Sequence, residues 1–144
     1  MSIVYKDDVS VNNVMLNLNE FPIIQKRAIL KDSLEQMSLF KLGIACVVEE
    51  NETFVGLITD GDIRRILLSI QKPLSALFME DVLDHIAESP TVITPEMSLS
   101  DATKIMGLKR VWDLPVVSEN KKLVGLFHLH RALEFLFSLK VKKS

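Results

Sequence analysis

Residues 47–57 read VVEENETFVGL, and 69 positions later residues 116–126 read VVSENKKLVGL. In both segments an apolar pair precedes a polar stretch that contains Glu-Asn, and a second apolar run with a central glycine follows. This pattern is typical of a strand, a short turn and a second strand. Its return at a fixed interval indicates that a larger supersecondary unit has been duplicated.

The similarity extends outward from this hairpin. Residues 24–58 align with residues 93–127 without a gap, and twelve of these 35 positions are identical. Two copies are too few for a solenoid, and each copy leaves an apolar face uncovered. We therefore expect the copies to pack together about a pseudo-twofold axis.

Each copy predicts the order β-α-β-β-α, from the positions of its apolar residues and turn residues. In the first copy we expect an extended piece, a helix, two strands and a helix at Pro22–Gln25, around Leu30 to Met37, Ile44–Val48, Phe54–Ile58 and Asp60–Ile70. In the second copy the extended piece is expected at Thr91–Thr94 and the first helix after the cap Ser98. The two strands are expected at Leu114–Val117 and Leu123–Phe127, and the second helix at His128–Lys140. A short helix is expected between the copies, at Asp81–Ile86.

Composition bounds the class of protein. Of 144 residues, 48% are hydrophobic and 25% are charged, which describes a soluble globular chain. Lys and Arg number 17 against 19 Asp and Glu, so no basic surplus points to nucleic acid or an anionic membrane as partner. The single cysteine, Cys46, excludes an intrachain disulfide. With no apolar run long enough for a bilayer and no signal peptide, a cytoplasmic location is expected.

The repeat resembles a tandem of cystathionine-β-synthase-type (CBS) domains, often called a Bateman module. The resemblance covers about residues 10–138 and rests on residues 114–117 (LPVV), 123–126 (LVGL) and 55–65 (VGLITDGDIRR). The last stretch, and residues 128–130 (HLH), resemble the C-terminal CBS pair of arabinose-5-phosphate isomerases; related pairs precede some sugar nucleotidyltransferases. The resemblance implies an α/β fold of α+β type, divided here into residues 1–75 and 76–144.

The segment around Thr59 is the candidate ligand site. Gly56 would allow a close approach, and the helix that begins after Thr59 would offer N–H groups to a phosphate. In the CBS family Thr-x-x-Asp at this place binds a nucleotide, which implies that Thr59 meets phosphate and Asp62 accepts the ribose hydroxyls. Electrostatics agree with that division, because a carboxylate about 4 Å from a phosphate is repelled by roughly 4 kcal/mol at an effective dielectric of 20.

A structural alternative explains the same residues. Thr59 and Asp62 have the spacing of a capping box, in which each side chain caps a backbone N–H of the other residue. Asp60 with Arg64, and Asp62 with Arg65, would then be ordinary surface ion pairs. Spacing alone favours this alternative, whereas the family position of the motif favours a ligand site.

The second copy departs from the motif, because His128 replaces Thr59 and Arg131 replaces Asp62. Without a carboxylate to hold a ribose, we expect one conventional nucleoside site in the chain. Arg131 could contact phosphate or be a surface residue, and His128 could bind phosphate or sense pH. By resemblance, Ile24 packs on the base, and the backbone of Gly43, Ile44 and Ala45 meets it.

No catalytic set is recognisable. The chain offers no combination of nucleophile, general base and oxyanion hole, so it is not predicted to be an enzyme. Its three histidines, at positions 85, 128 and 130, do not predict a metal site, and no cofactor is required. The predicted ligand is AMP, ADP, ATP or a related nucleotide.

Three functions fit these observations. The first is a regulatory module that binds an adenosine-type nucleotide or a sugar nucleotide between the copies and signals to a partner or attached enzyme. The second is an interaction module whose nucleotide site is vestigial. The third is the regulatory part of a sugar-phosphate isomerase or sugar nucleotidyltransferase. A homodimer is expected from the family and from the apolar residues of the last helix: Phe135, Leu136, Phe137 and Leu139.

Overall fold

The computed structural model of the chain describes residues 9–87 and 89–143, with side chains up to residue 138. The chain forms two compact units, and their boundaries differ from those of the sequence repeats. One unit consists of residues 19–90, and the other joins residues 1–18 to residues 91–144. We call them the first-repeat unit and the second-repeat unit, after the copy that each contains.

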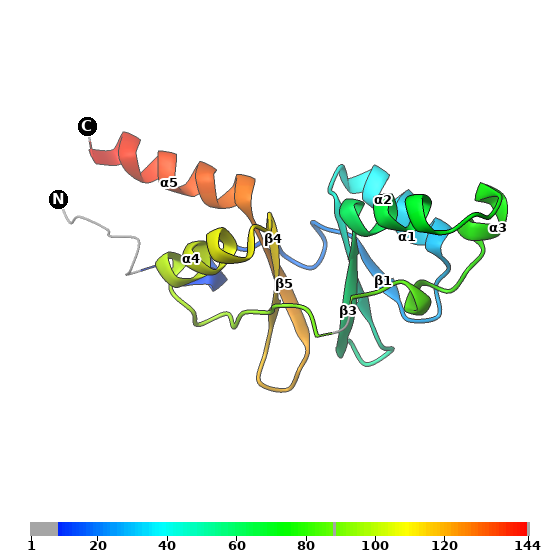
Figure 1. Cartoon of the computed structure of the whole chain (residues 1–144). Helices are drawn as coiled ribbons and strands as arrows, with labels where there is room; N and C mark the ends of the chain where they lie inside the picture. The colour runs from blue at the N-terminus through cyan, green and yellow to red at the C-terminus, as the bar shows by residue number, and fades with distance from the viewer. Residues whose placement is uncertain (1–8, 88, 144) are drawn as a thin grey trace. The chain divides into compact units, whose positions relative to one another are not determined.

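The first-repeat unit is a three-stranded sheet covered by helices (Figure 1). Its elements are β1 (Ile23–Gln25), α1 (Leu30–Phe40), β2 (Ile44–Val48), β3 (Phe54–Thr59) and α2 (Asp60–Ser69). The sheet order is β1-β2-β3, in which β1 is parallel and β3 antiparallel to β2. All five residues of β2 are buried, which explains why this central strand is an unbroken apolar run.

The segment that follows α2 stays with this unit. It forms α3 (Leu74–Phe78) and a 3-10 helix, η3 (Val82–Asp84). The Val82 N–H donates to the Ala28 carbonyl at 2.9 Å, and the Ala87 N–H donates to the Leu57 carbonyl of β3 at 3.3 Å. The short helix predicted at Asp81–Ile86 is thus found as η3, whereas α3 was not predicted.

The second-repeat unit repeats the plan with a two-stranded sheet. Its elements are α4 (Leu99–Lys109), β4 (Asp113–Val117), β5 (Leu123–His128) and α5 (Leu129–Lys143). The predicted cap is present, since the Ser98 hydroxyl accepts the Asp101 N–H at 3.0 Å. The predicted extended piece at Thr91–Thr94 makes only one bridge, Ile93 to Val116, and is not a full strand.

The start of the chain belongs to the second-repeat unit. A 3-10 helix, η2 (Val11–Asn13), is held by the Val11 N–H, which donates to the Met97 carbonyl at 2.8 Å. Leu16 and Leu126 exchange backbone hydrogen bonds of 2.8 and 3.1 Å. These bonds place Val11 near the start of α4 and Leu16 beside β5, so the compact units differ from the division expected at residues 75 and 76.

The registers of the two units are related by the 69-residue shift. Ile24 pairs with Val47 and Ile93 with Val116, in parallel, and Gly56 and Gly125 lie opposite these two valines. Both hairpins contain an irregularity after that valine, and α1 and α4 end at Lys41 and Arg110, which share a left-handed φ of 56° and 55°. This correspondence confirms the predicted duplication and the α+β fold.

Gly56 and Gly125 are needed for the same reason. A Cβ on Gly56 would lie 2.9 Å from the Ile86 side chain, and one on Gly125 would lie 2.9 Å from the Leu16 carbonyl oxygen. Each glycine therefore lets the segment that leads into the other sequence repeat pack directly on the strand.

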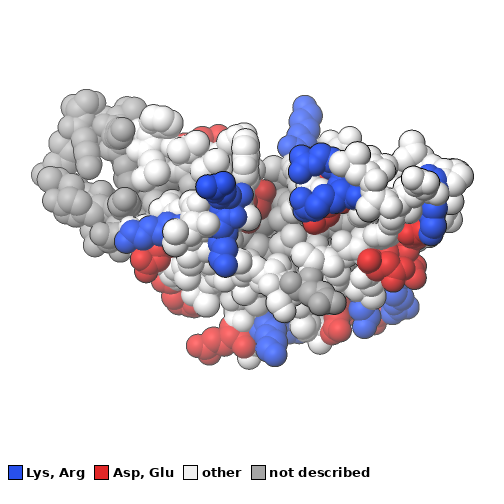
Figure 2. Space-filling model, in the orientation of Figure 1, with Lys and Arg blue, Asp and Glu red and all other residues white. Residues whose placement is uncertain are grey.

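The surface carries charges of both signs. Acidic and basic side chains both occur on the face shown in Figure 2, between broad areas of uncharged residues. None of the helices in the described ranges combines the length and apolar character needed to cross a membrane.

Candidate functional site

The Thr59 and Asp62 side chains meet where β3 ends and α2 begins. The Thr59 backbone N–H donates to Asp62 Oδ2 at 2.9 Å, and the Thr59 hydroxyl donates to the same oxygen at 3.0 Å. In return, the Asp62 N–H donates to Thr59 Oγ1 at 3.2 Å. The capping box considered from spacing is therefore present, with an additional hydroxyl–carboxylate bond.

One of the two ion pairs expected on α2 forms. Arg65 Nη2 lies 2.7 Å from Asp62 Oδ1, so both carboxylate oxygens of Asp62 have partners. The expected pair of Asp60 with Arg64 is absent: within the described chain neither side chain makes an ion pair. A carboxylate has about four lone-pair positions, so Asp62 keeps acceptor capacity beyond these contacts.

The start of β2 lies beside Thr59. Ile44 and Thr59 are register partners, Ala45 pairs with Ile58, and the Asp60 N–H donates to the Gly43 carbonyl at 3.0 Å. The structure thus brings Gly43, Ile44 and Ala45 next to the Thr59 end of the sheet. Ile44 and Ala45 are 1% and 0% exposed, backbone included, so of these three residues only Gly43, which is half-buried, has surface that a ligand can reach.

Ile24 lies deeper than the other predicted residues. It pairs with Val47 in the middle of β2 and is 6% exposed. Its neighbours in the core include Leu30, Met37 and Ala45. In this structure Ile24 is a core residue of the first-repeat unit, and its predicted contact with a base stays a prediction.

The second-repeat unit builds the equivalent position differently. His128 Nδ1 lies 2.6 Å from Asp113 Oδ1, and both side chains are 12% exposed. Asp113 and His128 face each other across the β4–β5 ladder, as Ile44 and Thr59 do across β2–β3. Arg131 is half-buried in the first turn of α5 and makes interactions of its own.

Two further aromatic residues extend this pair. The His130 ring lies 5.0 Å from the His128 ring and 6.3 Å from the Trp112 ring, edge-on in both cases. The 69-residue shift places Gly61 and Gly43 at the positions of His130 and Trp112. The first repeat therefore has Thr59 and two glycines at the three positions where the second repeat carries aromatic rings.

The contact of His128 with Asp113 was not predicted from the sequence, because His128 was compared only with Thr59. The cross-strand register would have revealed it: Asp113 takes the place of the apolar Ile44 at the start of an otherwise apolar strand. A carboxylate at such a half-buried position needs a partner, and His128 directly opposite supplies one.

The arrangement offers two kinds of chemistry. In the first repeat, a hydroxyl and a carboxylate lie together at a helix N-terminus, which suits a ligand with a phosphate and sugar hydroxyls. In the second repeat, imidazole and indole rings replace them. In the ranges 9–87 and 89–143, no three His, Cys, Asp or Glu side chains converge as metal ligands would.

Comparisons with curated proteins identify relatives of greater length. An uncharacterized protein of Helicobacter pylori J99 is 30% identical over 122 residues, which make up 83% of this chain and 35% of that protein. Arabinose 5-phosphate isomerase KdsD of Escherichia coli K12 is 26% identical over 123 residues, 85% of this chain and 36% of the isomerase. The chain thus spans about a third of the length of the curated relatives it matches.

Solved structures share the fold. The crystal structure of CBSX2 in complex with AMP, a CBS-pair protein of Arabidopsis thaliana, has a TM-score of 0.79 and 24% identity, covering 91% of this chain and 98% of that one. The structure of CbpB in complex with c-di-AMP has a TM-score of 0.77 and 14% identity, covering 93% and 88%.

The family model of the CBS domain matches twice, at residues 11–69 and 79–138. These ranges contain both copies of the repeat and the Thr59 and His128 positions. The resemblance stated from the sequence is confirmed: the chain belongs to the CBS-domain family and is a tandem CBS pair.

Proposed function

We propose that the protein is a regulatory module that binds an adenosine-type nucleotide or a sugar nucleotide through its first repeat. The observation that carries this proposal is the contact of Thr59 with Asp62 at the start of α2, at the place where the second repeat has His128 and Arg131. Crystal structures of CBS pairs with AMP and with c-di-AMP support the ligand class.

In this proposal the ligand binds to the hydrogen-bonding positions of Thr59 and Asp62 that the capping box leaves unused. The Thr59 hydroxyl lies at the helix N-terminus and contacts phosphate, while Asp62 accepts hydrogen bonds from the ribose hydroxyls. The Gly43 backbone meets the base, and Ile24 packs near it. The phosphate contacts expected for Arg131 and His128 stay predictions; neither side chain offers the carboxylate that Asp62 would supply to a ribose.

The relatives suggest a class of regulated partner. The Escherichia coli isomerase matches this chain over 36% of its length, so a CBS pair like this one accompanies further sequence there. We propose that this module likewise acts on an attached or associated enzyme of sugar-phosphate or sugar-nucleotide metabolism, and has no catalytic role itself.

Calorimetry with AMP, ADP, ATP and a cytidine sugar nucleotide tests the ligand proposal. We expect wild type to bind at least one of them and Asp62→Ala to lose about one to two decades of affinity, as for a lost hydrogen bond to a charged group. Asp32→Ala is the matched control, because Asp32 accepts the Ile29 N–H at 3.0 Å at the start of α1. Wild-type binding to none of the four nucleotides would contradict the proposal.

The Asp62→Asn variant separates binding from helix capping. An amide oxygen can still accept the Thr59 N–H, so this variant should be more stable than Asp62→Ala but should still bind nucleotide weakly. If Asp62→Ala binds as tightly as wild type, the carboxylate only caps the helix, and the ribose assignment is wrong.

A second candidate, an interaction module that forms homodimers, is favoured by exposed apolar residues on the helices. Leu39 of α1 and its counterpart Leu108 of α4 are 70% and 84% exposed, and Leu68 and its counterpart Phe137 are 80% and 61% exposed. Of the other residues predicted for this surface, Phe135 and Leu136 are half-buried against the core of their own unit, and the Leu139 side chain lies outside the described residues. Large exposed apolar side chains repeated at equivalent positions favour an association surface. A monomer in sedimentation at micromolar concentration would contradict the dimer.

A further inference from the structure

The side chain of Arg65 folds back over the first turn of α2. A Cβ built on Gly61 would lie 3.3 and 3.4 Å from the two terminal nitrogens of Arg65, and 3.6 Å from Thr59 Oγ1. The same guanidinium donates to Asp62 Oδ1 at 2.7 Å. The Arg65 guanidinium, the Thr59 hydroxyl and the Asp62 carboxylate therefore meet beside Gly61 at the start of the helix.

The ion pair with Asp62 uses only part of the Arg65 guanidinium. An arginine has five N–H donors, and among the described residues the hydrogen bond from Nη2 to Asp62 is the one that this group makes. The Arg65 side chain is 63% exposed, whereas that of Asp62 is 19% exposed. The remaining donors are therefore accessible to a ligand at the helix start while the contact with Asp62 is kept.

The second repeat carries the opposite charges at these positions. The 69-residue shift places Arg131 at the position of Asp62 and Glu134 at the position of Arg65. A helix at this place thus does not require an acidic residue followed by a basic one. The guanidinium occurs only in the repeat that also has the hydroxyl–carboxylate contact, and the carboxylate of Glu134 would repel a phosphate.

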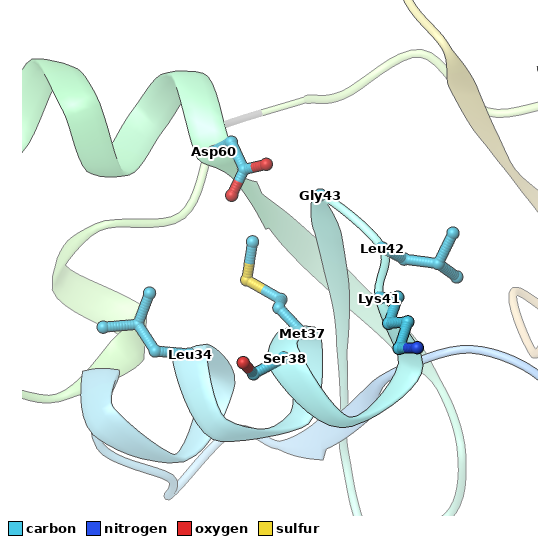
Figure 3. A pocket seen from close by; sticks show the side chains of 7 residues that line it. All are labelled: Leu34, Met37, Ser38, Lys41, Leu42, Gly43 and Asp60. Carbon is cyan, nitrogen blue, oxygen red and sulfur yellow. The ribbon is translucent and has the colours of Figure 1, made fainter.

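A phosphate at the start of α2 would meet two carboxylates of the same helical turn, Asp60 and Asp62. Figure 3 shows Asp60 reaching from α2 toward a hollow of about 380 Å³, which Gly43 also lines. Lys41, the cation among the lining residues, extends away from Asp60 in that view. Because both carboxylates oppose a phosphate at close range, its binding needs a nearby cation, and Arg65 supplies one.

We propose that Arg65 is the residue by which the first repeat distinguishes a phosphorylated nucleoside from the unphosphorylated one. This inference rests on the nucleotide site proposed above. The guanidinium keeps Nη2 on Asp62, which accepts the ribose hydroxyls, and donates from its remaining N–H groups to the phosphate beside Thr59. The ligand class of the site is then nucleosides that carry a 5′-phosphate, and free nucleosides bind weakly.

Calorimetry at one fixed ionic strength compares AMP with adenosine on wild type, Arg65→Gln and Arg64→Gln. We expect wild type to bind AMP at least about tenfold more tightly than adenosine. Arg65→Gln should weaken AMP about tenfold and change adenosine less than about twofold. If the cytidine sugar nucleotide is the ligand that binds, it is compared with cytidine in the same way.

Arg64→Gln is the matched control. It removes the same charge from the adjacent residue, which is exposed and makes no ion pair within the described part of the chain. Its affinities for AMP and adenosine should stay within about twofold of wild type. Equal weakening of AMP by Arg64→Gln and Arg65→Gln would reduce the effect to the general charge of α2 and overturn the proposal.

Two other outcomes would overturn the role of Arg65 and leave the nucleotide site standing. If Arg65→Gln binds AMP as tightly as wild type, the contact with Asp62 is an ordinary surface ion pair. If Arg65→Gln weakens AMP and adenosine equally, Arg65 only holds Asp62 in place. Wild type that binds neither the nucleotides nor the nucleosides would instead overturn the nucleotide site itself, and the role of Arg65 with it.

Discussion

At the residue scale, the two copies differ most at the junction between the last strand and the last helix of each repeat, β3–α2 and β5–α5. Thr59 and Asp62 form a capping box in the first repeat, whereas His128 faces Asp113 across the strands in the second. The sequence predicted the first contact, because capping depends on a spacing of three residues. The second contact joins residues 15 positions apart and could be found only from the strand register.

The His128–Asp113 pair should behave as one unit. Asp113→Ile alone leaves a half-buried imidazole without its carboxylate, and His128→Thr alone leaves the carboxylate without its partner; each should cost about 1–3 kcal/mol of unfolding free energy. The double variant recreates the Ile44–Thr59 pair of the first repeat and should be more stable than the sum of the single effects predicts. Urea denaturation measures all four proteins, and strictly additive losses would contradict the coupling.

At the element scale, the segment that precedes each sequence repeat packs on the other repeat. Residues 9–16 pack on the second repeat, and residues 80–87 pack on the first. These segments are equivalent with a shift of 71 positions: η2 starts at Val11 and η3 at Val82, both 0% exposed. The two-residue offset from the main repeat conceals this equivalence in a gapless alignment.

Matched substitutions in η2 and η3 test the exchange. Val11 belongs to the core with Leu114 and Val116, and Val82 belongs to the core with Val47 and Ile58. Val11→Ala should lower the hydrogen-exchange protection of β4 and β5, and Val82→Ala that of β2 and β3, with losses of about 1–3 kcal/mol each. Loss of protection in β2 and β3 upon Val11→Ala would contradict the assignment.

The segment after α3 also carries the clearest pH dependence. The Lys72 ammonium, and secondly the His85 ring 2.8 Å from Oε1, hold the pKa of Glu80 below its ordinary value. The unfolded chain therefore binds this proton more readily, so the stabilisation is present above the ordinary carboxyl range and is lost as pH falls through it. Glu80→Gln should reduce the drop in urea midpoint between about pH 7 and about pH 3.

The control for that measurement is Glu119→Gln. Glu119 is exposed and makes no ion pair within the described part of the chain. Its substitution should leave the pH dependence unchanged. Equal slopes for wild type and Glu80→Gln would show that the Lys72 and His85 contacts do not hold in solution.

Periodicity and turn residues predicted the β-α-β-β-α order well, because those signals are local. Ser98 was identified as a cap, and the strands at 44–48 and 54–58 lie within a residue of their observed bounds. What failed depended on tertiary packing. The helix Leu74–Phe78 was missed behind Pro73, Ile93 makes one bridge where a strand was expected, and Asp60 leans toward Gly43 without pairing with Arg64.

At the scale of the whole molecule, the two repeats share the same arrangement of helices and strands but differ in the residues around the start of α2 and α5. The first repeat keeps Gly43, Gly61, Thr59 and Asp62, and the second carries Trp112, His130, His128 and Arg131 at the same positions. The hairpin registers match, so at these positions the two copies differ in their side chains. The proposed nucleotide site is therefore expected in the first repeat and not in the second.

The most direct measurement is amide chemical-shift mapping of the labelled protein during titration with AMP. The Thr59 N–H, which donates to Asp62 Oδ2, is a built-in reporter of the capping box. If the first repeat binds the nucleotide as proposed, the largest shifts fall on Thr59, Gly61 and Asp62, and they disappear in Asp62→Ala. Shifts confined to residues 128–131, or no shift at millimolar AMP and the other nucleotides, would contradict a first-repeat nucleotide site.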